Sequence, residues 1–213
     1  MGKYKRILLV VEFILLFAGI PLLIYLDEDF LHPSIIVLPV LVFVFWVLLR
    51  TTTFKWKELV RWGITTSQLR INAAIYGLVV LLAIACVYFF DRENLFNLPR
   101  ANPWMFLAMC IFYPVFSAFG QEVIYRTFLF RRYGTLFGRE WLTILFSGLT
   151  FSFLHIVYYN PISMILTFVG GIYFARVYRQ TGSVLFSAVL HGCYGVMVFG
   201  VGFGQYFWLD IPI

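Results

Sequence analysis

Long apolar stretches alternate with short polar segments along the whole chain. A helix that crosses the hydrocarbon core of a bilayer needs about 20 mostly apolar residues, with a range of about 17–25. The second of these stretches, residues 34–49, is short, and the fourth, residues 103–130, is long enough to be tilted or broken. The pattern predicts an all-α, polytopic integral membrane bundle of about seven transmembrane helices. The seven stretches cover residues 7–26, 34–49, 71–90, 103–130, 141–159, 162–178 and 183–200.

The predicted helices can be assigned to two parts of the chain. Residues 1–102 contain the first three predicted helices and a basic loop at 50–70, and residues 103–213 contain the other four. In the loop, Trp56 and Trp62 stand among Lys and Arg residues. Such a segment either lies as an amphipathic helix on the cytoplasmic leaflet or forms a solvated connector with aromatic anchors. The sequence leaves both structures open.

Composition supports the membrane assignment. Hydrophobic residues make up 62% of the chain and charged residues only 12%, whereas soluble domains have about 45–50% apolar and about 25% charged residues. The same numbers exclude a disordered chain. The three cysteines, Cys86, Cys110 and Cys193, lie in apolar runs without a CxxC pair, so we expect them to be small packing residues.

The net charge of +6 reflects topology. If the N-terminus is cytoplasmic and the stretches alternate in direction, the outer segments contain only Arg92 and Arg100. This bias follows the positive-inside rule, and it predicts a multi-pass protein of the plasma membrane that contacts membrane lipids and binds no nucleic acid. The inner segments contain Lys3, Lys5, Arg6, Arg50, Lys55, Lys57, Arg61, Arg70, Arg131, Arg132, Arg139, Arg176 and Arg179.

A few ionisable side chains fall inside the apolar stretches, where each costs about 2.5–3.5 kcal/mol on insertion scales and is a functional candidate. Glu122 and Arg126 are four residues apart, so they share one helix face and can pair, which keeps Glu122 ionised. Gln121 is rotated by about 100° to an adjacent face. His155 and His191 lie on two later stretches, and Glu12 lies near the start of the first.

These side chains allow several interpretations. Two imidazoles and a carboxylate can polarise a water molecule or hold a divalent metal such as zinc, with Glu122, His155 and His191 as the ligands. The same residues can also form a structural ion pair and hydrogen bonds between helices. A third interpretation is a small transporter or proton relay through Glu12, Glu122 and His155.

The order of these residues resembles the CPBP family of membrane proteins. Gln121-Glu122-x3-Arg126, then Phe151-x3-His155, then His191 are similar to its motifs Glu-Glu-x3-Arg, Phe-x3-His and His-x3-Asn. The family comprises type II CAAX prenyl endopeptidases and bacteriocin-processing or immunity (Abi) proteins. The resemblance covers roughly residues 103–200.

The resemblance implies an intramembrane endopeptidase. In the family, a glutamate helped by the second-motif histidine activates a water molecule, and the third-motif histidine and asparagine stabilise the oxyanion. Carried over, this makes Glu122, His155 and His191 the catalytic residues, with Gln121, Arg126 and Phe151 in support. The expected substrate is a membrane-proximal peptide or a prenylated or otherwise lipidated protein, and a divalent metal is an optional cofactor.

The chain departs from the motifs at two positions. The first motif glutamate is Gln121, and a carboxamide cannot accept a proton from water at neutral pH. The third motif asparagine is Gly195, which has no side-chain donor. Three interpretations remain: Glu122 serves as the base, the chain is an inactive relative that acts as a membrane binding, immunity or scaffold protein, or Gln121 is a substitution introduced at a natural glutamate.

Overall fold

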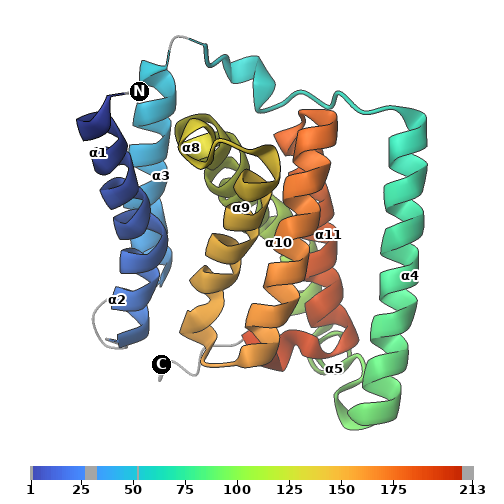
Figure 1. Cartoon of the computed structure of the whole chain (residues 1–213). Helices are drawn as coiled ribbons and strands as arrows, with labels where there is room; N and C mark the ends of the chain where they lie inside the picture. The colour runs from blue at the N-terminus through green and yellow to red at the C-terminus, as the bar shows by residue number, and fades with distance from the viewer. Residues whose placement is uncertain (1, 27–32, 52, 208–213) are drawn as a thin grey trace.

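Every predicted apolar stretch corresponds to a helix of the computed structural model shown in Figure 1. The structure describes residues 2–26, 33–51 and 53–207, and only the backbone of residues 33–37. Every regular element in these ranges is an α-, 3₁₀- or π-helix. The prediction of an all-α membrane bundle is confirmed. The main helices are α1–η1–α2 (Lys3–Ile14, Leu15–Gly19, Ile20–Leu26), α3 (Pro33–Arg50), α4 (Thr66–Phe90), α9–η6 (Glu140–Leu154, His155–Tyr158), α10 (Pro161–Thr181) and α11 (Val184–Val201).

The fourth stretch forms one long helix with two π-helical segments. It runs through α6 (Pro103–Phe112), η4 (Tyr113–Ala118), α7 (Phe119–Glu122), η5 (Val123–Phe128) and α8 (Leu129–Phe137). π-helical segments are rare and often lie at functional sites. Here they flank α7, the short segment that carries Gln121 and Glu122. The fourth stretch is therefore one continuous helix of 35 residues, and π-helical segments are found in it in place of the expected break.

The predicted count of seven spans is not confirmed. Within the described residues, six helices are long and apolar enough to cross a membrane. The part of α3 with described side chains, Leu38–Arg50, is a shorter apolar helix. It packs in the same bundle, because Val44 and Leu48 share the main hydrophobic core with Phe128 of η5.

The basic loop is an irregular connector. Its described residues contain one 3₁₀ turn, η2 (Trp56–Glu58), before α4 begins at Thr66 with a capping box between Thr65 and Gln68. The described residues before α4 form no longer helix, so the interfacial-helix alternative is wrong for them, and the irregular backbone agrees with a connector. Gly63 adopts a positive φ of 52°, a conformation that interrupts helical geometry between the turn and α4.

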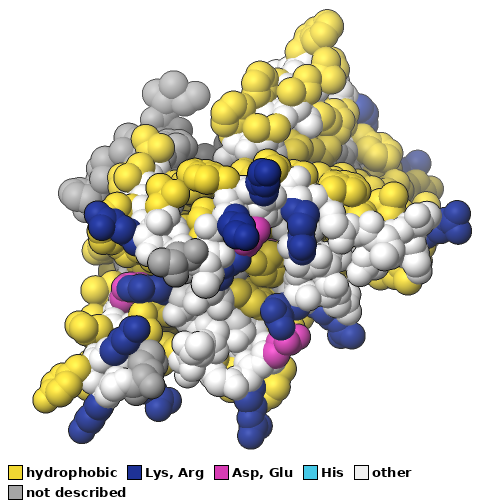
Figure 2. Space-filling model, turned by 90° about the horizontal axis from the view of Figure 1, so that it is seen from above, with side chains coloured by type: hydrophobic (Ala, Val, Ile, Leu, Met, Phe, Trp, Pro, Cys, Tyr) yellow, Lys and Arg dark blue, Asp and Glu magenta, His cyan; other side chains and the backbone are white. Residues whose placement is uncertain are grey.

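Lys and Arg side chains gather at the end of the bundle that carries the N-terminus and α8. Figure 2 looks onto this end and shows Lys and Arg side chains spread over it. Three of them form ion pairs there, and the partners are Arg131 with Glu58, Arg132 with Glu12, and Arg179 with Glu140. Several of the basic residues in the predicted inner segments thus lie together at one end of the molecule.

Glycines allow the inner helices to approach closely. In α11, a Cβ atom at Gly192 would come within 2.7 Å of Pro114, so this helix contacts η4 through its glycine face. In α10, a Cβ atom at Gly171 would come within 3.0 Å of the Cα of Gly148 in α9. Small residues at helix crossings give the van der Waals packing that drives helix association in lipid. The glycines therefore bring α9, α10, α11 and η4 together around the motif residues.

Helix α4 is the least buried of the long helices and stands at one side of the bundle in Figure 1. It contacts α10 and α11 through a narrow stripe. Asn72 accepts a hydrogen bond of 2.6 Å from the Tyr173 hydroxyl, and the Tyr76 hydroxyl donates to the Cys193 carbonyl at 3.3 Å. Most of its other side chains face outward, as expected for a helix surrounded by lipid.

The glycine contact between α9 and α10 yields a stability prediction. We expect Gly171→Val to destabilise the protein by about 1–3 kcal/mol, since overpacking a tight core has costs of this size. The measurement is thermal unfolding of the purified protein in detergent micelles. Gly77→Val in α4 is the matched control, because a Cβ atom there meets nothing within 4 Å. Equal melting temperatures for the two variants would contradict the tight crossing.

Candidate active site

The Glu122 carboxylate is completely buried at the end of α7. Its Oε2 lies 3.1 Å from Nε of Arg126 and accepts a hydrogen bond from the Ser187 hydroxyl. Its Oε1 lies 3.1 Å from Nδ1 of His191. The predicted pairing of Glu122 with Arg126 is confirmed. Both carboxylate oxygens are engaged by fixed protein donors.

The Arg126 guanidinium is also completely buried. Its Nη1 donates to the Ser147 hydroxyl at 2.6 Å and to the Tyr125 carbonyl at 3.3 Å. Its Cζ lies 5.4 Å from the centroid of the Phe151 ring, a cation–π contact. Removing one partner of a buried ion pair leaves an uncompensated charge, which destabilises a protein strongly. The position of Arg126 therefore depends on the charge of Glu122.

His191 is engaged at both ring nitrogens. Since the Glu122 carboxylate accepts, Nδ1 of His191 carries the hydrogen of that bond. Its Nε2 lies 3.3 Å from the hydroxyl of Tyr113 and is the acceptor. The imidazole also stacks on Phe174, with ring centroids 5.1 Å apart and an interplanar angle of 17°. These contacts fix both the tautomer and the plane of the ring.

His155 has one engaged and one open ring nitrogen. It begins the 3₁₀ turn η6, and its Nδ1 lies 2.7 Å from the Phe151 carbonyl. A carbonyl oxygen only accepts, so Nδ1 carries the hydrogen and Nε2 has a free lone pair. No hydrogen bond to Nε2 is present among the described residues, and 9% of the residue's surface stays exposed. His155 can therefore accept a proton at Nε2.

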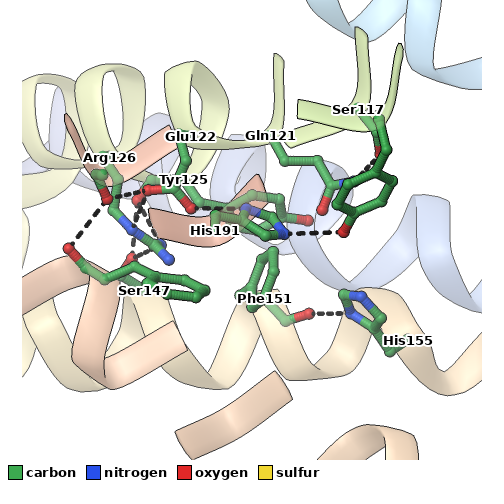
Figure 3. Close-up of polar contacts among 12 residues, drawn as sticks. Ser117, Gln121, Glu122, Tyr125, Arg126, Ser147, Phe151, His155 and His191 are labelled. Atoms are coloured by element: carbon green, nitrogen blue, oxygen red, sulfur yellow. Dashed lines mark hydrogen bonds and ion pairs between the residues drawn. The ribbon is translucent and has the colours of Figure 1, made fainter. Parts of the chain in front are cut away.

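The Gln121 amide points away from the ion pair, as the helical rotation predicts. Its Nε2 donates to the Ser117 hydroxyl at 2.9 Å. Its Oε1 is buried and has no hydrogen-bond partner within the described residues. A buried acceptor without a partner is a favourable place for an ordered water molecule. Figure 3 shows the Gln121 amide turned toward Ser117, and His155 at the Phe151 carbonyl.

Phe151 links the two histidines. Its ring centroid lies 5.2 Å from that of His191 and 4.9 Å from that of His155, with the rings edge-on in both cases. The structure thus brings the residues of all three motifs into one region. Glu122 and His191 are in direct contact, whereas His155 is separated from them by the Phe151 ring.

The three predicted ligands do not form a metal site in this arrangement. The described part of the chain contains no group of three His, Cys, Asp or Glu side chains that could hold a metal ion. The Glu122 carboxylate is paired with Arg126 and hydrogen-bonded to Ser187, and both ring nitrogens of His191 are in hydrogen bonds. These side chains therefore do not fit a divalent metal such as zinc.

Glu12 belongs to a separate contact. Its two oxygens accept hydrogen bonds of 2.9 Å and 2.7 Å from the Arg132 guanidinium, and one of them accepts a bond of 2.7 Å from the Tyr133 hydroxyl. This bidentate pair ties the first helix to α8. No hydrogen bond or ion pair among the described residues joins Glu12 to Glu122 or His155, so the geometry gives no support to a proton relay through the three.

Three polar partners of the cluster were not expected from the sequence: Tyr113, Ser147 and Ser187. A signal was present for Ser187, which precedes His191 by one helical turn and shares its face. Tyr113 and Ser147 lie on other helices, and no spacing rule connects them to the motifs.

The buried ion pair yields a second stability prediction. Glu122→Gln should destabilise the protein by about 3–5 kcal/mol, because it leaves the Arg126 charge buried and unpaired. The double variant Glu122→Gln/Arg126→Met should recover much of this loss. Chemical unfolding in micelles measures both values, and Glu93→Gln at an exposed position is the control. A small effect of Glu122→Gln, equal to that of the control, would contradict the assignment.

Comparison with known proteins identifies the region that carries the motifs. A family model described as type II CAAX prenyl endopeptidase, Rce1-like, matches residues 103–197. No curated protein and no solved structure matches the chain. The matched segment contains all three motifs and every residue of the buried cluster, in the order that the resemblance to the CPBP family implied. The match covers slightly less than half of the chain, and it supports the resemblance of this segment to the CPBP family.

Proposed function

We propose that the chain is an intramembrane endopeptidase that hydrolyses a membrane-proximal or lipidated peptide. Two findings support this function: the match to a family of prenyl endopeptidases, and six helices that are able to cross a membrane. The observation that carries the proposal is the state of His155. Its Nδ1 is held by the Phe151 carbonyl, so its Nε2 is oriented as an open proton acceptor within the motif region.

The roles follow from which atoms are free. A water molecule donates one hydrogen bond to Oε1 of Gln121 and the other to Nε2 of His155. As the water oxygen attacks the peptide carbonyl carbon, His155 takes a proton from it, and a tetrahedral oxyanion forms. The carbon–nitrogen bond then breaks, and the leaving amine takes the proton from His155. Gln121 orients the water and needs no proton of its own.

Glu122 has a supporting role in this scheme. Its oxygens are occupied by Arg126, Ser187 and His191, so neither is free to act as a base. Its charge fixes the Nδ1–H tautomer of His191. Arg126 and Phe151 complete the same support, because the guanidinium lies over the ring that contacts both histidines.

A second candidate is a non-catalytic membrane binding or scaffold protein. One observation favours it: the side chain at the position of the family's catalytic glutamate is the Gln121 amide, and the neighbouring carboxylate is fully engaged. Such a protein would hold a lipidated peptide at the motif region without cleaving it. The two candidates differ in whether the wild-type chain, with Gln121, cleaves the peptide that it binds.

We further propose that the basic end seen in Figure 2 faces the cytoplasm and contacts anionic lipids of the plasma membrane, with the N-terminus on that side. The membrane location itself follows from the apolar helices and the family. The orientation rests on the excess of Lys and Arg at one end.

The test is cleavage of a farnesylated peptide that ends in a Cys-aliphatic-aliphatic-X sequence, with the protein in lipid vesicles and products measured by mass spectrometry. For an endopeptidase, His155→Ala should lower the rate by about a hundredfold or more, because it removes the general base. Gln121→Glu should raise the rate, because it adds a second acceptor. Gln180→Glu, at an exposed position, is the control for the added charge.

Two outcomes would contradict the endopeptidase mechanism. If His155→Ala cleaved as fast as the wild type, His155 would not be the base. If the wild type bound the peptide without cleaving it, and Gln121→Glu gained cleavage, the binding function would be supported instead.

A further inference from the structure

The space beside Gly195 is occupied by Tyr113. A Cβ atom built at Gly195 would collide with the ring and hydroxyl of Tyr113, whose Cε1, Cζ and Oη are its three nearest atoms. Glycine at 195 is therefore what allows the Tyr113 hydroxyl to reach this position. A side chain that projected from residue 195 would enter the same volume.

The Tyr113 hydroxyl also ends a chain of hydrogen bonds. The Glu122 carboxylate accepts from Nδ1 of His191, and Nε2 of His191 lies 3.3 Å from the Tyr113 oxygen. This carboxylate–imidazole–hydroxyl order orients the O–H group and raises its polarity. Tyr113 as a residue is half-buried, and its hydroxyl lies beside the cluster at the His191 imidazole.

The local helix geometry places this hydroxyl. Tyr113 is the first residue of the π-helical segment η4, which packs against the glycine face of α11. Its ring contacts the His191 imidazole edge-on, with centroids 6.1 Å apart. The mechanism proposed above uses Gln121 and His155 for the water and assigns no donor to the substrate oxygen.

We propose that the Tyr113 hydroxyl is a catalytic residue that donates a hydrogen bond to the oxyanion formed at the substrate carbonyl. Rotation about the Cζ–O bond turns the O–H from Nε2 of His191 to the oxyanion, with no net proton transfer. The hydroxyl takes the place of a donor at position 195. This inference rests on the proposed peptidase function and adds a specific residue to it.

The first test compares Tyr113→Phe with the wild type in the vesicle assay. One oxyanion donor contributes about a hundredfold or more to kcat, so we expect a loss of that size with little change in KM. Tyr4→Phe is the control, because Tyr4 is 84% exposed. A Tyr113→Phe variant with the kcat of the wild type would overturn the proposal.

The second test exchanges the donor between the two positions. Tyr113→Ala removes the hydroxyl and Gly195→Asn overlaps the Tyr113 ring, so each single variant should lose activity. The double variant Tyr113→Ala/Gly195→Asn has room for the new amide and should recover at least tenfold over Tyr113→Ala. A double variant no faster than Tyr113→Ala would contradict the proposal that the Tyr113 hydroxyl and a donor at residue 195 occupy the same place.

A third measurement separates this inference from the proposed function. A phosphinate analogue of the peptide carries a tetrahedral anionic centre, whereas the peptide itself carries a planar amide. Tyr113→Phe should weaken binding of the phosphinate tenfold or more. Binding of the peptide is measured in proteins that also carry His155→Ala, so that the peptide is not cleaved, and there Tyr113→Phe should leave the affinity unchanged. Equal effects on both ligands would indicate a structural role and overturn the proposal. A different result would overturn the peptidase function alone: the wild type does not cleave the peptide, and Tyr113→Phe still weakens binding of the phosphinate but not of the peptide.

Discussion

The structure depends on one buried ion pair, between Glu122 and Arg126. Two charges with no exposed surface are stable only where every nearby partner is in place. Those partners come from other helices: Ser187 and His191 from α11, and Ser147 from α9. The pair therefore fixes the relative positions of these three helices. The glycine contacts serve the same end, because they allow the backbones to come close enough for short side chains to reach the pair.

Because both carboxylate oxygens of Glu122 are occupied, the proposed mechanism needs another side chain as proton acceptor. The two histidines have similar sequence settings, each within an apolar stretch, but different hydrogen bonding. His191 is closed at both nitrogens by Glu122 and Tyr113, whereas His155 keeps Nε2 open. In the proposed mechanism, a carboxamide at 121 is compatible with hydrolysis because the open imidazole of His155 accepts the proton. The proposal thus divides the cluster into a rigid support and a reactive part.

The sequence predicted the features that depend on length and local spacing. Apolar length predicted the helices, and the interval of four residues predicted the Glu122–Arg126 pair. The connector at 51–65 could not be decided, because an interfacial helix and an irregular loop share the same basic and aromatic composition. The link between Tyr113 and Gly195 left no signal, since a glycine carries no side chain and the complementarity arises only when η4 packs on α11. The 3₁₀ turn that begins at His155 and frees its Nε2 was likewise invisible to periodicity.

The central claim, that His155 offers an open Nε2 while His191 is closed, is tested most directly by nitrogen NMR of the histidine rings. The protein is labelled with ¹⁵N-histidine in micelles, and the His155→Ala variant assigns the signals. We predict that His155 shows a protonated Nδ1 and an unprotonated Nε2, and that this Nε2 signal responds to the water content of the sample. A proton on Nε2 of His155, with an unprotonated Nδ1, would contradict the proposed base.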